Sequence, residues 1–378
     1  TRVRSSAASD VYKRQQEISA RIGRVTGKGI AGNIREHYPV SLLRVIVALL
    51  LAANIINLGA DLGAMGDAMR LLVGGSAGLY VVLFAAACTG LEIFLRYERY
   101  VRILKWTTLS LFAYVATVLV VGVPWREVVL GTLVPSFSFE TDYIVAIVAV
   151  LGTTISPYLF FWQASEEAED ERVDPDAHPL AEAPQQARRE IRRIRIDTYL
   201  GMGLSNLVAL CIIVTTAATL HQHGITDIAT SDQAAEALRP IAGQLAFVVF
   251  AAGIVGTGML AVPVLAGSAA YALAEARGWP TGLGRLPGDA KAFYSTIAVG
   301  TLIGIGINFV ALDPIKALFW SAVINGLVAV PLMVVMMLMT MRHEVMGGFT
   351  LPRPLWAMGW LATAVMAFTA ATMLVTSL

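Results

Sequence analysis

The segment TDYIVAIVAVLGTTISPYLFFWQ (residues 141–163) decides the fold, because it is long and apolar enough to cross a membrane and yet contains a helix breaker at its middle. Gly152, two threonines, a serine and Pro157 stand together there. Proline lacks a backbone N–H and disfavours helix in the residue before it. The sequence therefore predicts a helix that is interrupted near 152–157.

An interrupted helix inside a membrane has two interpretations. Unpaired backbone groups are tolerated in lipid only where protein or a water-filled cavity meets them, and many transporters bind ions at such breaks. The alternative is an ordinary proline kink whose free backbone groups are satisfied by neighbouring hydroxyls. The clustering of three hydroxyls, Thr153, Thr154 and Ser156, favours a cation site with hydroxyl and carbonyl ligands.

The rest of the chain is also strongly apolar. Of its 378 residues, 56% are hydrophobic and 15% are charged, and the mean hydropathy is +0.67, which indicates an integral membrane protein. A net charge of +1 gives no bulk attraction to nucleic acid. The sequence contains no nucleophile with a partner base, no HExxH and no phosphate loop, so an enzyme is not expected.

Apolar runs of about 20 residues, the length that spans a hydrocarbon core, recur throughout the chain. They predict an all-α polytopic helical bundle with spans at 40–62, 77–95, 106–123, 141–163, 197–219, 241–274, 293–311, 315–339 and 355–377, and a shorter helical piece at 16–34. Residues 1–15 carry no apolar run and are expected to be a non-native or disordered leader. The predicted membrane domain is therefore 16–378.

Lysine and arginine concentrate in alternate connections between these spans. The poorer set holds only Arg70, Arg126, Arg239 and Lys316. Because basic loops stay in the cytoplasm, the richer set is expected inside and the carboxyl terminus outside. The longest polar stretch, 164–196, is then a cytoplasmic linker, acidic at its start and basic at its end. Such a charge run is usually solvated, and the alternative is an acidic mouth that gathers cations.

A polar stripe marks the predicted span at 40–62. Asn54, Asn57 and Asp61 are spaced to lie on one helical face. A carboxylate within a membrane is costly and usually faces a cavity, so the stripe is a candidate lining for an ion pathway. The alternative assigns the asparagines to hydrogen bonds between helices and Asp61 to the headgroup level. Asn325, in a later span, is a further pathway candidate with the same alternative.

Two motifs resemble the Nramp family of divalent metal transporters. The run QEISARIGRVTGKGIA (Gln16 to Ala31) resembles the second helix of that family, and GTTISPYLFFWQAS (152–165) resembles its sixth. The resemblance implies a LeuT-like fold of two inverted repeats, whose first and sixth helices break around a metal site. The family's first helix, with its Asp-Pro-Gly-Asn motif, would lie upstream of Gln16, so the fold is expected without that helix.

The sixth helix of the family usually carries Met-Pro-His and a second histidine. The matching positions here are Ser156, Pro157, Tyr158 and Gln163. Without the thioether, selection for soft transition metals is weaker and harder cations are favoured. Without the histidines, groups that titrate near neutral pH are missing, which puts proton coupling in doubt. The resemblance thus implies a divergent, Nramp-related branch in which Tyr158 and Gln163 are pathway candidates.

These observations predict transport of a divalent cation of the Mn, Fe or Mg class by alternating access. The metal ion is the substrate, no cofactor is expected, and the lipid bilayer of a bacterial plasma membrane is the expected surrounding. One alternative is a LeuT-fold transporter of an amino acid or another small organic solute. The other is a membrane scaffold or receptor that transports nothing.

Overall fold

The computed structural model describes residues 2–94, 112–133, 138, 140–219, 231–310 and 314–376. Helices make up most of these residues, and none of the described residues lies in a β-strand. The helices are α1 (Arg2–Thr26), α2 (Ile30–His37), α3 (Val40–Val73), α4 (Ala77–Phe94), α6 (Phe112–Val120), α7 (Trp125–Leu133), α8 (Thr141–Thr154), α9 (Pro157–Val173), α10 (Ala187–Thr219), α11 (Ser231–Arg277), α12 (Lys291–Ile307), α13 (Pro314–Met339), α14 (His343–Met346) and α15 (Arg353–Thr376).

Seven helical stretches among the described residues are long and apolar enough to cross a membrane by length and composition. They overlap the predicted spans that begin at residues 40, 77, 141, 197, 241, 315 and 355, and α12 is a shorter apolar helix that overlaps the predicted span 293–311. The beginning of the predicted span 106–123 lies outside the described residues, and α6 follows it. The all-α, polytopic fold class is therefore confirmed.

The amino-terminal helix differs from the prediction at both ends. α1 begins at Arg2, so residues 2–15, expected as a disordered leader, are helical. α1 ends at Thr26 because Gly27 adopts a positive φ of 64°, which suits glycine, and donates its N–H to Gly23 O at 2.8 Å. α2 then starts at Ile30, so the predicted single piece at 16–34 is two helices.

α3 is longer than its predicted span of 40–62. The glycine-rich continuation to Val73 stays helical because it packs tightly against α4. At Gly66, an added Cβ would lie 2.8 Å from the Ala77 carbonyl oxygen, so only glycine permits this approach. The helix stops at Gly74, which has a φ of 79°.

The predicted linker at 164–196 is mostly helix. α9 continues through its acidic start to Val173, and α10 begins at Ala187, so only 174–186 connects the two helices. A short 3-10 turn, Pro184–Gln186, precedes α10. The connection is anchored to α1, because Leu180 N–H donates to Arg24 O at 3.1 Å.

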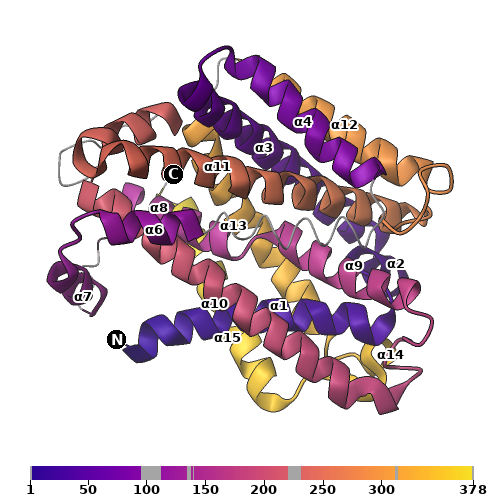
Figure 1. Cartoon of the computed structure of the whole chain (residues 1–378). Helices are drawn as coiled ribbons and strands as arrows, with labels where there is room; N and C mark the ends of the chain where they lie inside the picture. Colours follow the sequence, from indigo (N-terminus) through magenta and orange to yellow (C-terminus); the bar gives the residue numbers. More distant parts are fainter. Residues whose placement is uncertain are drawn as a thin grey trace.

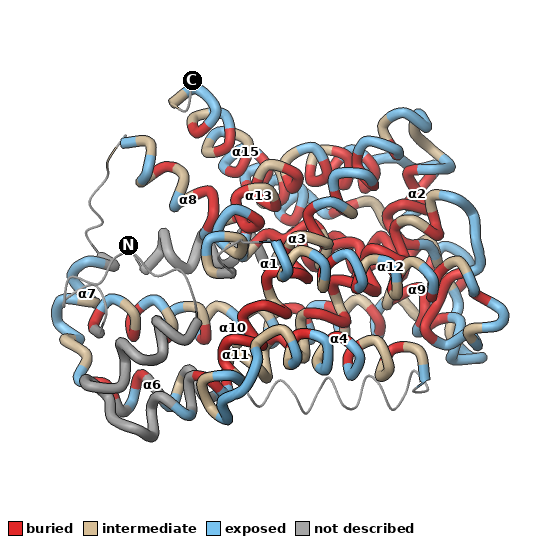
Figure 2. The backbone as a smooth tube through the Cα atoms, turned by 90° about the horizontal axis from the view of Figure 1, so that it is seen from above, coloured by how far each residue is buried: buried red, intermediate tan, exposed pale blue. Residues whose placement is uncertain are grey.

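The bundle is organised around two apolar clusters. In the first, residues from α1, α9, α13 and α15 pack together, among them Ile18, Phe161, Met333 and Met366. In the second, α3, α4, α11 and α12 meet, with Leu62, Val81, Tyr271 and Phe293. Figure 1 shows α1 and α10 along one side of the bundle and α4 with α12 along the other, and Figure 2 shows the buried residues gathered between them.

Tyr158, at the start of α9, packs against both clusters. The first residues of α9 therefore lie where the two clusters meet.

Candidate functional site at the helix break

The membrane helix at 141–173 is interrupted at Ile155 and Ser156. Both residues have extended or irregular backbone, with φ and ψ of −110° and 65° at Ile155 and −83° and 125° at Ser156. Pro157 takes the first position of α9, where its missing N–H costs no helical hydrogen bond. The interruption lies inside the interval 152–157 that the sequence indicates.

The three hydroxyls at the break bond to the preceding turn. Thr153 donates to Ala149 O at 2.9 Å, Thr154 donates to Val150 O at 2.7 Å, and Ser156 donates to Gly152 O at 3.0 Å. A hydroxyl that has donated its hydrogen keeps oxygen lone pairs that can accept a bond or ligate a cation.

The same three hydroxyl residues differ in burial. Ser156 is 2% exposed, whereas Thr154 is half-buried and Thr153 is exposed. Of the three, Ser156 is the one enclosed by protein.

The first turn of α9 is held by side chains from two other helices. Tyr158 O accepts from Ser268 of α11 at 3.0 Å, and Leu159 O accepts from Gln16 Nε2 of α1 at 3.1 Å. Phe160 O accepts from the Ser19 hydroxyl of α1. The sequence analysis missed Ser19 and Ser268, since a lone serine in a helical run gives no signal. Gln16 lies in a motif that was quoted only for family resemblance.

The asparagines of the polar stripe bond to neighbouring helices. Asn54 is buried and donates to Leu265 O at 3.0 Å and to Ser268 Oγ at 3.4 Å. Asn57 is also buried and accepts from the Ser321 hydroxyl of α13. Asn54 therefore supports the serine that holds Tyr158, and both asparagines connect helices.

Asp61 lies close to the break rather than at an end of its helix. It is partly exposed, and its carboxylate interacts electrostatically with Tyr158 of α9 and Cys88 of α4. The Tyr158 hydroxyl in turn interacts with the Ser156 side chain. The structure thus brings together Asp61, Tyr158 and Ser156 from the candidates that the sequence names.

Two candidates remain, Asn325 on α13 and Gln163 on α9. Asn325 is 3% exposed on α13, and its Oδ1 accepts no hydrogen bond from the described residues. Its neighbour Gly326 faces Gly152, so Asn325 is next to the contact between α13 and α8. Gln163 lies further along α9, where it accepts from Gln16 and donates to Glu167, both at 3.5 Å.

Comparison with known proteins relates this chain to a family. A family model described as "Natural resistance-associated macrophage protein-like" matches residues 14–376. The chain belongs to the Nramp family. The motifs at Gln16 and at the helix break therefore indicated the family correctly.

Curated Nramp relatives are named "Divalent metal cation transporter MntH". The Pectobacterium carotovorum protein is 28% identical over 65% of this chain and 57% of its own length. The Klebsiella pneumoniae protein is 26% identical over 93% of this chain and 80% of its own length. The chain thus spans less than two thirds of the length of the Pectobacterium carotovorum protein.

A solved Nramp structure has the same fold. The chain superposes on a manganese transporter from Eremococcus coleocola with a TM-score of 0.72 at 17% identity, over 96% of this chain and 77% of that one. At this identity the similarity shows the fold alone.

Among the described residues of this Nramp chain, no three His, Cys, Asp or Glu side chains gather in the way that would hold a metal ion. Hydroxyls, amides and backbone carbonyls are the groups that the break provides, and they suit hard divalent cations.

A second polar feature, which the sequence analysis did not foresee, lies at the far end of α9. Glu167, Glu169 and Glu171 are 3%, 2% and 8% exposed, so these three carboxylates are not solvated, whereas the aspartates of the same run are exposed. Glu167 pairs with Arg193 of α10, and Glu169 pairs with Arg172 at 3.1 Å. These carboxylates form an ionic network rather than an open acidic mouth.

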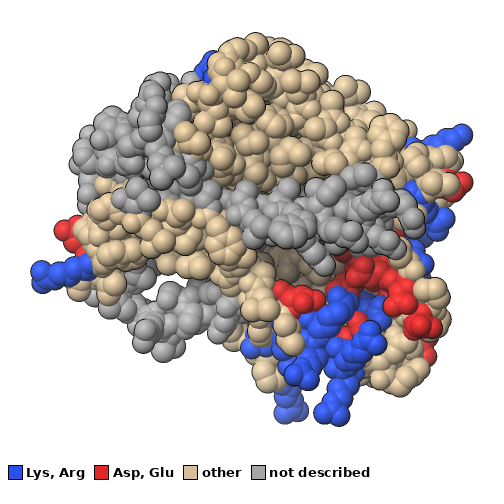
Figure 3. Space-filling model, in the orientation of Figure 1, with Lys and Arg blue, Asp and Glu red and all other residues tan. Residues whose placement is uncertain are grey.

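Arg24 of α1 is the centre of this network. It is 3% exposed, and its guanidinium lies 3.3 Å from Glu171 Oε1 and 3.8 Å from Glu190 Oε2. It also donates to Gln186 Oε1 at 3.3 Å. Figure 3 shows the mixed acidic and basic surface over α9 and α10. The sequence does show the acidic run and the basic run that follows it. Neither run indicates that an arginine of α1 connects the two.

Proposed function

We propose that this Nramp protein transports divalent metal cations of the Mn, Fe or Mg class by alternating access and holds the ion at the helix break 152–157. The observation that carries the proposal is the interruption at Ile155 and Ser156, which lies between two packed halves of a membrane bundle. Membership of a family whose curated relatives are named divalent metal cation transporters supports the same cargo.

Ser156 is the ligand best supported by the geometry. Its hydrogen points into the preceding turn, which leaves its oxygen lone pairs available to a cation. Asp61 supplies negative charge near Tyr158, and the Asn325 Oδ1 is a buried oxygen without a hydrogen bond from the described residues. Thr153 and Thr154 complete the proposed set.

The break also supports alternating access. α8 packs against α13 and α15, whereas α9 packs against α1 and α11. Two halves of one span therefore belong to different parts of the bundle and are joined by two non-helical residues. Relative movement of such parts is how transporters built around broken helices open to each side in turn.

We propose that the charged end of the bundle faces the cytoplasm of a bacterial plasma membrane. Basic residues expected inside meet there in the structure, since Arg24 contacts the α10 region and Arg342 donates to His37 O at 3.1 Å. If the basic connections all face the cytoplasm, they have to lie at the same end of the bundle, and these contacts agree with that. The carboxyl terminus would then lie outside.

The proposal is tested by flux into vesicles that contain the full-length protein. Mn²⁺, Fe²⁺ and Mg²⁺ are added outside, and uptake is followed with a metal-sensitive dye, with labelled amino acids as a parallel panel. We expect saturable metal uptake and no amino-acid uptake above that of protein-free vesicles. Uptake of an amino acid without metal flux would instead support a solute transporter, and absence of all flux would support a scaffold.

Ion selectivity gives a sharper test of the site. In the full-length protein, Ser156→Met is expected to raise the preference for Mn²⁺ over Mg²⁺ severalfold, because a thioether ligates softer cations better than a hydroxyl does. Competition between the two ions for uptake measures this preference. Ser205→Met, on an exposed position of α10, is the matched control. Equal selectivity in both variants would remove Ser156 from the site.

A further inference from the structure

An apolar groove of about 400 Å³ runs between α3, α11 and α12. Its walls are formed by Leu51 and Ile55 of α3, Leu273 of α11, and Val299 and Ile303 of α12. Gly300 also lines the groove, and a Cβ added there would meet no atom within 4 Å. The groove is therefore an open apolar slot on the side of the bundle, away from the helix break.

The groove extends from one end of the bundle to about the middle of the membrane. On α12 its lining runs from Ala292 to Ile303, which is 12 residues, or 11 steps of about 1.5 Å and thus about 16 Å in all. A hydrocarbon core is about 30 Å thick, so this length corresponds to one leaflet. A slot of this length and volume matches an extended acyl chain, and it is too small for a helix with a diameter of about 10–12 Å.

Trp279 lines the groove just after the end of α11, in the connection to α12. The same indole also lines a smaller cavity of about 170 Å³, which Lys28, Arg35 and Glu275 share. Glu275 is satisfied there by the Gly32 N–H at 3.1 Å and the Ser165 hydroxyl at 2.9 Å. Tryptophan is enriched at the level of lipid headgroups, so this end of the groove fits the membrane interface.

Three cations near this end of the groove have no carboxylate partner among the described residues. The Arg277 guanidinium lies 6.0 Å above the indole ring, and Arg35 lies against the backbone of Gly278. Lys291 is the first residue of α12, next to the lining residue Ala292. Nearby Lys28 is instead paired with Glu36 at 2.8 Å. The apolar slot thus ends at unpaired positive charge.

We propose that this groove binds an anionic phospholipid, with one acyl chain in the slot and the phosphate held by Arg35, Arg277 and Lys291. An apolar slot the length of one leaflet fits the chain, and the three cations complement the negative headgroup. The site is separate from the helix break, so it does not depend on which ion the protein carries. The lipid ties the α11–α12 connection to the α2 region through its headgroup.

The acyl-chain half of the site is tested by filling the slot. The purified protein in detergent is titrated with phosphatidylglycerol, and bound lipid is counted by native mass spectrometry. Gly300→Leu is expected to weaken binding at least about tenfold, because its side chain displaces several methylene groups. Gly306→Leu lies on the same helix at another position without Cβ contacts, and it should bind as the wild type does. Equal binding by both variants would overturn the proposal.

The headgroup half is tested by charge removal. Arg35→Gln, Arg277→Gln and Lys291→Gln are each expected to weaken phosphatidylglycerol binding about fivefold, and Arg188→Gln, on an exposed arginine of α10, should leave it unchanged. Phosphatidylcholine and glycerol phosphate are titrated into the wild type as comparison ligands. Weaker binding of each of them than of phosphatidylglycerol supports the proposal. Phosphatidylcholine binding as tight as phosphatidylglycerol, or glycerol phosphate binding without any chain, would overturn it.

Discussion

Gly152→Ala is expected to lower the stability of the protein and to abolish most of its transport. A Cβ at this position would overlap the Ala322 carbonyl oxygen of α13 and would lie 2.6 Å from Gly326 N. Both are backbone atoms, so no side-chain rotation can make room. Overpacking of this kind costs about 1–3 kcal/mol or more, which exceeds the roughly 1 kcal/mol that alanine gains over glycine in a helix.

The midpoint of thermal unfolding in detergent and metal uptake into vesicles measure this effect. Gly306→Ala is the control, because it makes the same change on α12 where a Cβ meets no neighbour. It should keep or slightly raise the unfolding midpoint, since glycine within a helix is destabilising. An unaltered midpoint and flux in Gly152→Ala would contradict the close approach of α8 to α13.

Arg24→Gln is expected to destabilise the fold by about 3–5 kcal/mol, the range found when one partner of a buried ion pair is removed. Glu171 would lose its cation while remaining 8% exposed. Glu190 would be affected less, because it keeps Arg193 at 2.9 Å. A large drop in the unfolding midpoint measures the loss.

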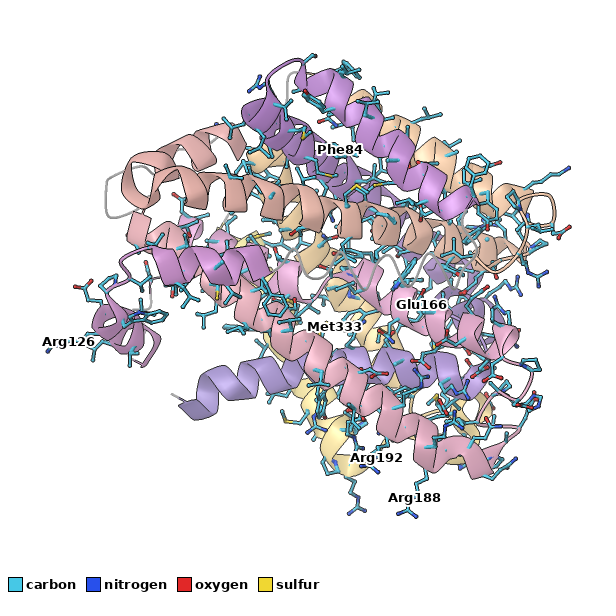
Figure 4. The ribbon with its side chains drawn as sticks, viewed as in Figure 1. Phe84, Arg126, Glu166, Arg188, Arg192 and Met333 are labelled. Atoms are coloured by element: carbon cyan, nitrogen blue, oxygen red, sulfur yellow. The ribbon has the colours of Figure 1, made fainter. Side chains whose placement is uncertain are left out.

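The double variant Arg24→Gln with Glu171→Gln separates the pair from the rest of the network. Removing both charges should recover part of the stability, because no buried carboxylate is then left without its cation. Arg188→Gln is the matched control, since Arg188 projects away from α10 as Arg192 does (Figure 4). A double variant no more stable than Arg24→Gln alone would show that Glu171 does not depend on Arg24.

Hydropathy predicted the spans well because each one needs a long apolar run, and a run such as 315–339 has no other interpretation. Boundaries were less predictable where packing opposes local preference. The glycine-rich part of α3 lies beyond the predicted span 40–62, but contact with α4 keeps it helical. Conversely, Gly27 ends α1 within a stretch that looked like one helix.

At the candidate site, the sequence located the break because proline and glycine act through local backbone chemistry. It could not assign the neighbours. Whether Asn54 faces an ion pathway or another helix depends on where Ser268 lies, more than two hundred residues further along the chain. The buried carboxylates of α9 were misjudged for the same reason, because the Arg24 that matches Glu171 comes from α1.

The first turn of α9, held by Gln16, Ser19 and Ser268, has a mechanical consequence. Those bonds fasten α9 to α1 and α11, whereas Gly152 seats α8 on α13. If the two bodies rotate against each other as proposed, the rotation would be concentrated on the backbone angles of Ile155 and Ser156, the two non-helical residues between them. A cation bound to Ser156 would then lie at the hinge, so the same two residues would govern both cation binding and the rotation.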